Sequence, residues 1–398
     1  MNNKWTVALA ALGVVSIASV AQAEEKASQA LTSLSSTTIS GYVDTSAHWN
    51  FGTGNANLPI YKFNSASKAD GFNLNVVQVS LDKPLDESEW ASGYHVDMWA
   101  GPDAKALGTS SFGGGGDVAV RQAYVALRAP LGTGLNLKMG VFDSIVGYES
   151  VEAGKNPNYT RSYGNYLDPQ THTGLLASYR FCEVFSASAG VANTAGPGIN
   201  DRANPPQAES YKTYMGSVAI TAPESMGFLK GSTLYAGAVS GFNENIPTPN
   251  PLAPTAKMPA QSYYLGATVA TPIEGLRFGA AYDLLIANTF AASTKQKSDD
   301  SALAGYVSYQ ATEKLSLHGR FDWARMDKDL PSTTDVSLYA TTATVQYDLW
   351  ANVLSRLEFR WDHADHGKVY GDSGISSSSI TPDRANAFLL ALNVIYKF

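Results

Sequence analysis

Apolar and polar residues alternate with a period of two along most of the chain, which is the pattern of a β-strand with two unlike faces. The segment 353–362 shows it clearly, with Val353, Leu357, Phe359 and Trp361 on one face and Arg356, Glu358, Arg360 and Asp362 on the other. One face of such a strand needs an apolar neighbour, and the other needs water or polar partners. The same alternation recurs at 39–51 and 315–323.

The alternation predicts about sixteen strands, and an even number is typical of bacterial outer-membrane barrels. They cover 38–51, 71–83, 92–101, 117–129, 135–143, 172–181, 184–193, 211–222, 228–241, 261–271, 275–285, 301–311, 314–325, 335–349, 353–363 and 385–398. Most have about ten to fourteen residues, which is long enough for a tilted strand to cross a membrane. Within 71–83 the apolar phase changes between Val76 and Val77, which indicates a bulge or an early strand end.

Short and long connections alternate between these strands, as they do in transmembrane barrels with short periplasmic turns and long external loops. The short ones are 130–134, 182–183, 223–227, 272–274, 312–313 and 350–352. The long ones are 52–70, 102–116, 144–171, 194–210, 242–260, 286–300, 326–334 and 364–384. The sequence therefore predicts an all-β fold, a transmembrane antiparallel up-and-down β-barrel of about sixteen strands.

Composition agrees with a barrel and excludes a helical membrane protein. Only 16% of the residues are charged, the chain has 21 Tyr and 15 Phe, and the mean hydropathy is −0.13. The one long apolar run, Trp5 to Val20, follows Lys4 and precedes the small residues Ala21 and Ala23, which is the pattern of a cleaved secretory signal. We therefore expect a signal peptide at 1–23, a short linker at 24–37 and an outer-membrane barrel at 38–398.

The chain ends on an apolar strand face that carries Tyr396 and Phe398. An aromatic carboxyl terminus on such a strand resembles the recognition signal of the outer-membrane assembly machinery. We expect the two residues to serve as that signal after export, with outer-membrane lipid as the surrounding partner.

Several short motifs make the chain similar to the OmpL-like β-barrel porin family. They are Gly41-Tyr42-Val43-Asp44, Gly93-Tyr94-His95-Val96-Asp97, Arg121-Gln122-Ala123-Tyr124-Val125, Lys138-Met139-Gly140, Gly147-Tyr148-Glu149, Asn158-Tyr159-Thr160-Arg161-Ser162-Tyr163 and His172-Thr173-Gly174. The resemblance implies a porin barrel that passes small hydrophilic solutes by passive diffusion, and a possible homotrimer. It carries no catalytic residue and no cofactor.

The segment 144–171 is the longest connection, and it resembles by order and length the loop that folds inward and narrows the channel of general porins. Its charged residues are candidates for a pore constriction: Glu149, Glu152, Lys155, Arg161 and Asp168. Basic residues at inward strand positions are candidates for the facing lumen wall: Lys138, Arg180, Arg320, Arg356 and Arg360. Charges of both signs predict weak selectivity with a mild preference for cations.

Two other functions stay open at the sequence level. A barrel hydrolase or protease needs a base beside a nucleophile, but none of the six His lies in a recognisable nucleophile motif, and His172 is expected to be an ordering hydrogen-bond partner. The segment 362–366, Asp-His-Ala-Asp-His, has metal-ligand residue types, but a solvated external loop explains it as well. An adhesin or receptor could use the Pro- and Asn-rich loop 243–260.

We therefore assign no catalytic, cofactor-binding or metal residue and expect a channel, not an enzyme. The formal net charge of −7 argues against nucleic acid as a partner.

Overall fold

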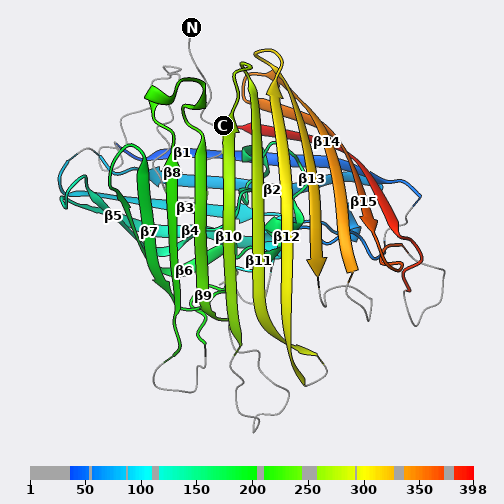
Figure 1. The fold of residues 1–398 in the computed structure, drawn as a ribbon, viewed down its shortest axis with the longest axis horizontal. Coiled ribbons are helices and arrows are strands. Elements are labelled where there is room, and N and C mark those ends of the chain that lie inside the picture. The colour runs from blue at the N-terminus through cyan, green and yellow to red at the C-terminus, as the bar shows by residue number, and fades with distance from the viewer. Residues whose placement is uncertain are drawn as a thin grey trace.

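The computed structural model describes residues 36–52, 56–86, 88–109, 116–203, 210–243, 258–291, 294–326, 336–371 and 381–398. Within these residues sixteen antiparallel strands close into one barrel, in which each strand pairs with its neighbours in sequence and β1 pairs with β16 (Figure 1). The predicted fold class is confirmed.

The strands that form the barrel are β1 (Thr38–Asn50), β2 (Gly71–Lys83), β3 (Ala91–Ala100), β4 (Val118–Ala129), β5 (Leu135–Asp143), β6 (Thr171–Arg180), β7 (Phe185–Ala192), β8 (Thr213–Thr221), β9 (Thr233–Phe242), β10 (Pro259–Ala270), β11 (Leu276–Ala291), β12 (Thr294–Gln310), β13 (Leu315–Met326), β14 (Val336–Trp350), β15 (Val353–Ala364) and β16 (Asn386–Lys397).

Two stretches of the prediction are wrong. The predicted long connection at 286–300 is mostly strand, because β11 and β12 stay paired as far as Ala291 and Thr294. The predicted strand at 228–241 begins only at Thr233, after a 3-10 helix at Glu224–Leu229.

The change of phase in β2 is a β-bulge. Val76 pairs with Asp44, whereas Leu74 pairs with Thr45, so that Asn75 is the extra residue. The bulge turns the Asn75 side chain into the barrel, where its amide nitrogen donates to Asp44 Oδ1 at 2.9 Å. Ser46 Oγ donates to Asn75 Oδ1 at 3.1 Å, so both ends of the amide are bonded. The bulge interpretation is confirmed, and the early strand end is not.

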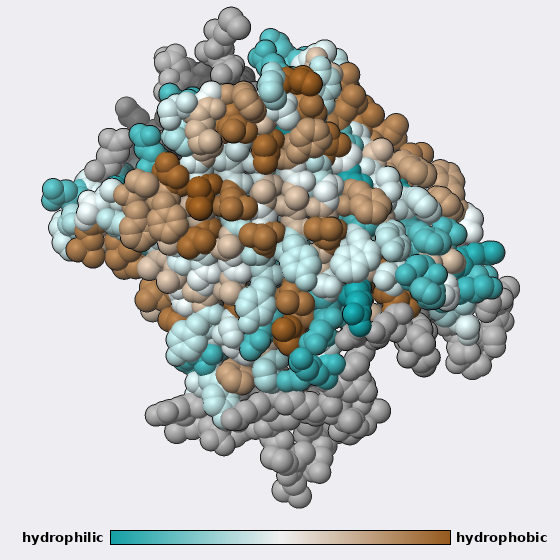
Figure 2. Space-filling view, viewed as in Figure 1, coloured by the Kyte–Doolittle hydropathy of each residue, from teal (hydrophilic) through white to brown (hydrophobic). Residues whose placement is uncertain are grey.

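The two faces of the barrel differ as the alternation predicted. Large apolar side chains such as Phe321, Leu357 and Phe359 are exposed on the outside, whereas Arg356 and Arg360, which flank the last two, are fully buried inside. Figure 2 shows hydrophobic residues spread over the outer surface of the strands that face the viewer. An outer surface of this kind suits contact with lipid, where a charged side chain at mid-depth costs about 2–4 kcal/mol.

Part of the interior is apolar, which the alternation alone did not predict. The segment after β5 packs Ile145 and Val146 against the inward side chains of the neighbouring wall, including Met215, Val239 and Tyr264. Gly237 leaves room for this contact, because a Cβ there would lie 2.9 Å from Val146 Cγ1.

The short connections and the carboxyl end of the chain lie at one rim of the barrel (Figure 1). Gly41 and Phe398 exchange two backbone hydrogen bonds of 3.0 Å across the junction of β1 and β16. The Phe398 ring covers Gly41, where a Cβ would lie 2.7 Å from its Cζ atom. The last residue of the chain therefore helps to close the barrel.

The helices are short connecting elements, α1 (Pro102–Leu107) and α2 (Tyr163–Leu167), with 3-10 helices at Ala66–Lys68 and Ala153–Lys155. No helix in the described ranges is long and apolar enough to cross a membrane. The expected signal peptide with Ala21 and Ala23 lies outside the described residues, as do most of the linker 24–37 and of the loop 243–260.

Candidate pore constriction

The segment between β5 and β6 lies inside the barrel and is buried over most of its length. Its base is closed by a hydrogen bond from Ser144 N to Gln170 O of 2.9 Å. Gly147 adopts a positive φ of 105° at the first bend, a conformation that a residue with a Cβ rarely adopts. Ser162 caps α2 by accepting a hydrogen bond from Asn165 N at 3.1 Å. We call residues 144–170 the inner loop.

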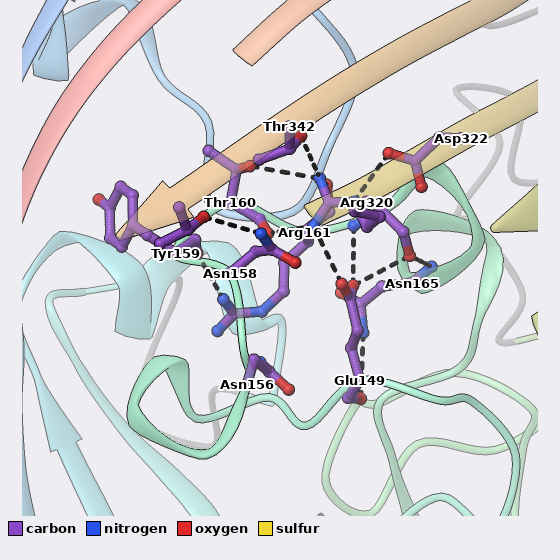
Figure 3. A network of polar contacts seen from close by, with 12 residues as sticks. Glu149, Asn156, Asn158, Tyr159, Thr160, Arg161, Asn165, Arg320, Asp322 and Thr342 are labelled. Atoms are coloured by element: carbon purple, nitrogen blue, oxygen red, sulfur yellow. Dashed lines mark hydrogen bonds and ion pairs between the residues drawn. The ribbon is translucent and has the colours of Figure 1, made fainter. Parts of the chain in front are cut away.

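Three arginines of β13 and β15 hold the backbone of the inner loop. Arg320 donates to Thr160 O at 2.6 Å and to Arg161 O at 3.0 Å, as Figure 3 shows. Arg360 donates to Arg161 O at 2.6 Å. Arg356 donates to Ala153 O, Asn156 O and Asn158 O at 3.1, 2.9 and 3.2 Å. These guanidinium groups are fully buried, so they act as anchors for the loop and not as an open basic surface.

Glu358 binds the same stretch from its amide side. Its carboxylate accepts hydrogen bonds from Tyr159 N at 2.6 Å, Thr160 N at 2.8 Å and Thr344 Oγ1 at 2.7 Å. Donors and acceptors of the loop backbone are therefore both satisfied by the wall, as buried backbone groups require.

Sequence reasoning missed Glu358 as a site residue, although it alternates with Arg356 and Arg360 on the inward face of one strand. Its place on that face is the sequence signal that could have identified Glu358.

Glu149 connects the inner loop to the barrel wall, and it also connects two parts of the loop to each other. It lies 3.1 Å from Arg320 Nη1 and accepts hydrogen bonds from Ser162 N and Ser162 Oγ at 2.7 and 2.9 Å. Arg161 donates to Tyr159 O and Val151 O, both at 2.7 Å, and so braces the loop internally. The structure brings Glu149, Arg161 and Arg320 into one buried network (Figure 3).

Glu152 and Lys155 form a second charged group, which is nearer to solvent. Lys155 Nζ lies 2.7 Å from Glu152 Oε1, and Arg121 Nη2 lies 3.4 Å from the same oxygen. Burial alone would raise the pKa of Glu152, but the Arg121 and Lys155 charges outweigh it and lower the pKa below its usual range. The Lys155 side chain is 51% exposed, which makes it the most accessible of the five constriction candidates.

Asp168 ends α2 and lies against the barrel wall beside Asp283 of β11. Burial raises the pKa of Asp168 well above its usual range, and the neighbouring Asp283 carboxyl raises it further. Asp168 also packs over Gly147, where a Cβ would lie 2.5 Å from Asp168 Oδ2.

The remaining two wall candidates lie apart from the network. Lys138 is partly exposed, with its Nζ atom 4.6 Å from the centre of the Tyr124 ring. Arg180 is exposed at the rim, where it donates to Cys182 O at 3.2 Å.

The residues considered for metal binding, 362–366, do not face one common site. Asp362 points inward and contacts Arg360 and the Tyr163 hydroxyl, at 2.7 and 2.6 Å. His366 is exposed beside Asp365. Among the described residues no three His, Cys, Asp or Glu side chains are arranged to hold a metal ion.

His172 is fully buried, and its Nε2 atom lies 3.1 Å from Ser144 Oγ, a contact that joins the first turn of the inner loop to β6.

Solved structures of outer-membrane channels share this fold at low sequence identity. The outer membrane channel DcaP of Acinetobacter baumannii is 11% identical with a TM-score of 0.58, over 91% of this chain and 97% of that one. An anion-selective porin from Comamonas acidovorans is 11% identical with a TM-score of 0.59, over 91% and 99%. The trimer form of OmpT, an outer membrane protein of Vibrio cholerae, is 12% identical with a TM-score of 0.57, again over 91% and 99%.

No curated protein matches the sequence. The family model described as "Putative beta-barrel porin-2, OmpL-like" matches residues 36–398, which is the whole of the barrel. With the closed sixteen-stranded barrel and its inner loop, this match shows that the chain belongs to the OmpL-like β-barrel porin family and is an outer-membrane porin.

Proposed function

We propose that this porin is a passive diffusion channel for small hydrophilic solutes, with residues 144–171 as the loop that narrows it. The observation that carries the proposal is the set of bonds from Arg320, Arg356, Arg360 and Glu358 to the loop backbone. A loop fixed to one wall at several points leaves a constriction of constant shape, as a sieving channel needs.

Liposome swelling with a series of uncharged sugars tests this function. Proteoliposomes should swell at a rate that falls steeply as the sugar becomes larger. Swelling no faster than in protein-free liposomes would contradict the proposal.

The inner-face charges that stay partly exposed around the loop support a weak preference for anions. The basic ones include Lys138, Lys155, Arg277 and Lys397, and the acidic ones include Asp82, Asp143 and Asp348. The acidic residues Glu149, Glu152 and Asp168 are buried, so they add little to the field that a solute meets. This proposal replaces the mild cation preference expected from the sequence.

The reversal potential in a KCl gradient tests the preference. It should indicate anion selectivity in the wild type, and Lys155→Gln should move it toward cations. A cation-selective wild type would contradict the proposal.

We also propose that the channel is not an enzyme. Two His–Ser contacts occur among the described residues, His172 with Ser144 at 3.1 Å and His318 with Ser308 at 2.9 Å. Neither His has an ion pair with a carboxylate in the described ranges, so neither pair has the orienting acid of a catalytic triad. Hydrolysis of an ester or a casein substrate by the purified barrel, above the level of a heat-denatured sample, would contradict this.

Two further proposals concern export and assembly. We propose cleavage after Ala23, with Ala21 and Ala23 as the small residues of the site, a linker at 24–37, and recognition of Tyr396 and Phe398 by the assembly machinery. Amino-terminal sequencing of the mature protein should begin at Glu24.

We further propose a homotrimer, since a barrel of similar fold, OmpT of Vibrio cholerae, is described in a trimer form. Native mass spectrometry in detergent should give three chains per particle.

A further inference from the structure

Residues 56–70 connect β1 to β2 at the rim opposite the short connections, and they fold inward over the inner loop. A connection at such a rim normally runs over the surface and stays solvated. Here only 8% of Tyr61 and 4% of Lys68 is exposed, although both side chains carry a polar group. Burial of this kind requires partners, and the barrel supplies them. We call residues 56–70 the covering segment.

Tyr61 covers one of the arginines that anchor the inner loop. The Arg360 Cζ atom lies 4.2 Å from the centre of the Tyr61 ring, a distance at which a guanidinium group and an aromatic ring attract each other. The same ring packs in one apolar cluster with Tyr159 of the inner loop and with Leu389 and Ala391 of β16. The covering segment therefore contacts both the inner loop and the barrel wall.

Phe63 makes the second contact with the inner loop. The centre of its ring lies 5.7 Å from the Arg161 Cζ atom and 5.8 Å from the centre of the Trp99 ring of β3. The Phe63 backbone has a φ of 66°, a left-handed conformation that a bulky residue rarely adopts. Such a conformation persists where the surrounding contacts hold it, so the packing of the ring fixes this part of the segment.

The two ends of the covering segment are attached to other connections of the same rim. Lys68 Nζ lies 2.5 Å from Asp103 Oδ1 of α1, and the two side chains are only 4% and 11% exposed. Asn57 Nδ2 donates to Gly371 O, in the connection between β15 and β16, at 2.7 Å. The segment is therefore held at both ends and in the middle.

The inward side chains at the two rims of the barrel differ in their access to solvent. Near the short connections, Arg277 and Asp348 stay partly exposed. At the opposite rim, Val336 and Leu338 at the start of β14 are fully buried, and Ile60 of the covering segment packs against their cluster. The covering segment thus closes part of the interior that would otherwise be open at this rim.

We propose that the covering segment is a second, outer layer of the constriction, and that Tyr61 and Phe63 are the positioning residues that hold it on the inner loop. This inference rests on the proposed diffusion function, because it states which residues set the size limit for a solute. The inner loop is bonded to the wall, and the covering segment lies on that loop. A solute that crosses the barrel must therefore pass both layers.

Thiol labelling shows whether the segment covers the wall, and it does not depend on conductance. Leu389→Cys places a reporter beside the Tyr61 ring, in a Cys182→Ser background because Cys182 is exposed. In the folded porin in detergent, a hydrophilic maleimide should modify this reporter slowly. The double substitution Tyr61→Ala and Phe63→Ala should raise the labelling rate at least about tenfold, the equivalent of about 1.4 kcal/mol in the opening of the segment.

Phe72→Ala is the matched control, because it removes an 89% exposed ring on the outside of β2 and should leave the labelling rate unchanged. Fast labelling of the reporter beneath the native segment, or no acceleration in the double variant, would overturn the proposal. Heat-modifiability on gels shows whether each variant folds. If the double variant does not fold, Lys68→Met, which breaks the pair with Asp103, takes its place with the same expectations.

Liposome swelling then tests the size limit. A trisaccharide should enter several times faster through the double variant than through the wild type, and Phe72→Ala should behave as the wild type does. A wild type that swells with the same size limit as the double variant would overturn this inference and leave the diffusion function standing. Swelling by the double variant alone would support the covering role and contradict diffusion through the wild-type channel. No swelling by either would overturn both.

Discussion

At the scale of single residues, the buried arginines of the inner wall act through the loop that they hold. Arg320 contacts Glu149, Asp322 and two loop carbonyls while it is fully buried. Removal of one partner from a buried ion pair leaves the other charge without compensation, which typically costs about 3–5 kcal/mol. The loop should therefore detach locally before the barrel itself fails.

Arg320→Ala tests this role. We expect a larger and noisier single-channel conductance, because residues 158–162 lose their anchor to β13. Arg180→Ala is the matched control, since Arg180 is exposed at the rim and should change neither property. A folded Arg320→Ala barrel with wild-type conductance would argue against the anchoring role.

The depressed pKa of Glu152 makes the inner loop sensitive to acid. A carboxyl whose pKa is lower in the folded state than in the unfolded state contributes stability above its unfolded pKa, and this stability is lost as the pH falls through the folded value. We expect the thermal midpoint of the barrel in detergent to drop below about pH 4.5, the ordinary Glu value. Glu152→Gln should flatten that drop, and an unchanged pH profile in the variant would exclude Glu152 as its source.

At the scale of elements, period-two alternation predicted the strands wherever one face meets lipid and the other meets the interior. It failed at β11 and β12, where the segment 294–300, Thr-Lys-Gln-Lys-Ser-Asp-Asp, is polar on both faces. The buried side chains there, Ser298 and Asp300, are as polar as the exposed ones, so the sequence carries no apolar alternation although the two strands are paired. It also failed before β9, where Phe228 and Leu229 are apolar but belong to a 3-10 helix.

The inner loop was predicted from its length and place, but the roles of its charges were not. In sequence, Arg320, Arg356 and Arg360 are ordinary lumen residues, and nothing in the alternation separates a solvated arginine from one bonded to a backbone carbonyl. That distinction depends on which part of the loop reaches each arginine. Each of these contacts joins residues more than 150 positions apart in the sequence.

Phe398, at the end of β16, has two proposed roles, as an assembly signal and as a residue that closes the barrel. Deletion of Phe398 removes its two backbone hydrogen bonds with Gly41 and the ring that covers Gly41, so we expect less barrel in the outer membrane with export unchanged. Phe398→Ala keeps the backbone pair and removes only the ring.

Fractionation of cells and heat-modifiability on gels measure both variants. Equal defects in both would assign the effect to the ring, and a defect in the deletion alone would assign it to the closing hydrogen bonds. Normal assembly of both variants would contradict both roles.

At the scale of the whole molecule, the barrel combines an apolar outer surface, a mixed interior and a loop bonded to one wall. The outer surface suits lipid, the bonds along β13 and β15 fix the loop, and the partly exposed charges around it remain available to solutes. These three features are the basis for the proposal of a narrow, permanently shaped pore.

Planar-bilayer recording of the purified porin tests the central claim most directly. The account predicts discrete conductance steps that rise in proportion to salt concentration, as expected for ions that cross a water-filled pore. Insertion of folded barrels into the bilayer without any such steps would contradict it.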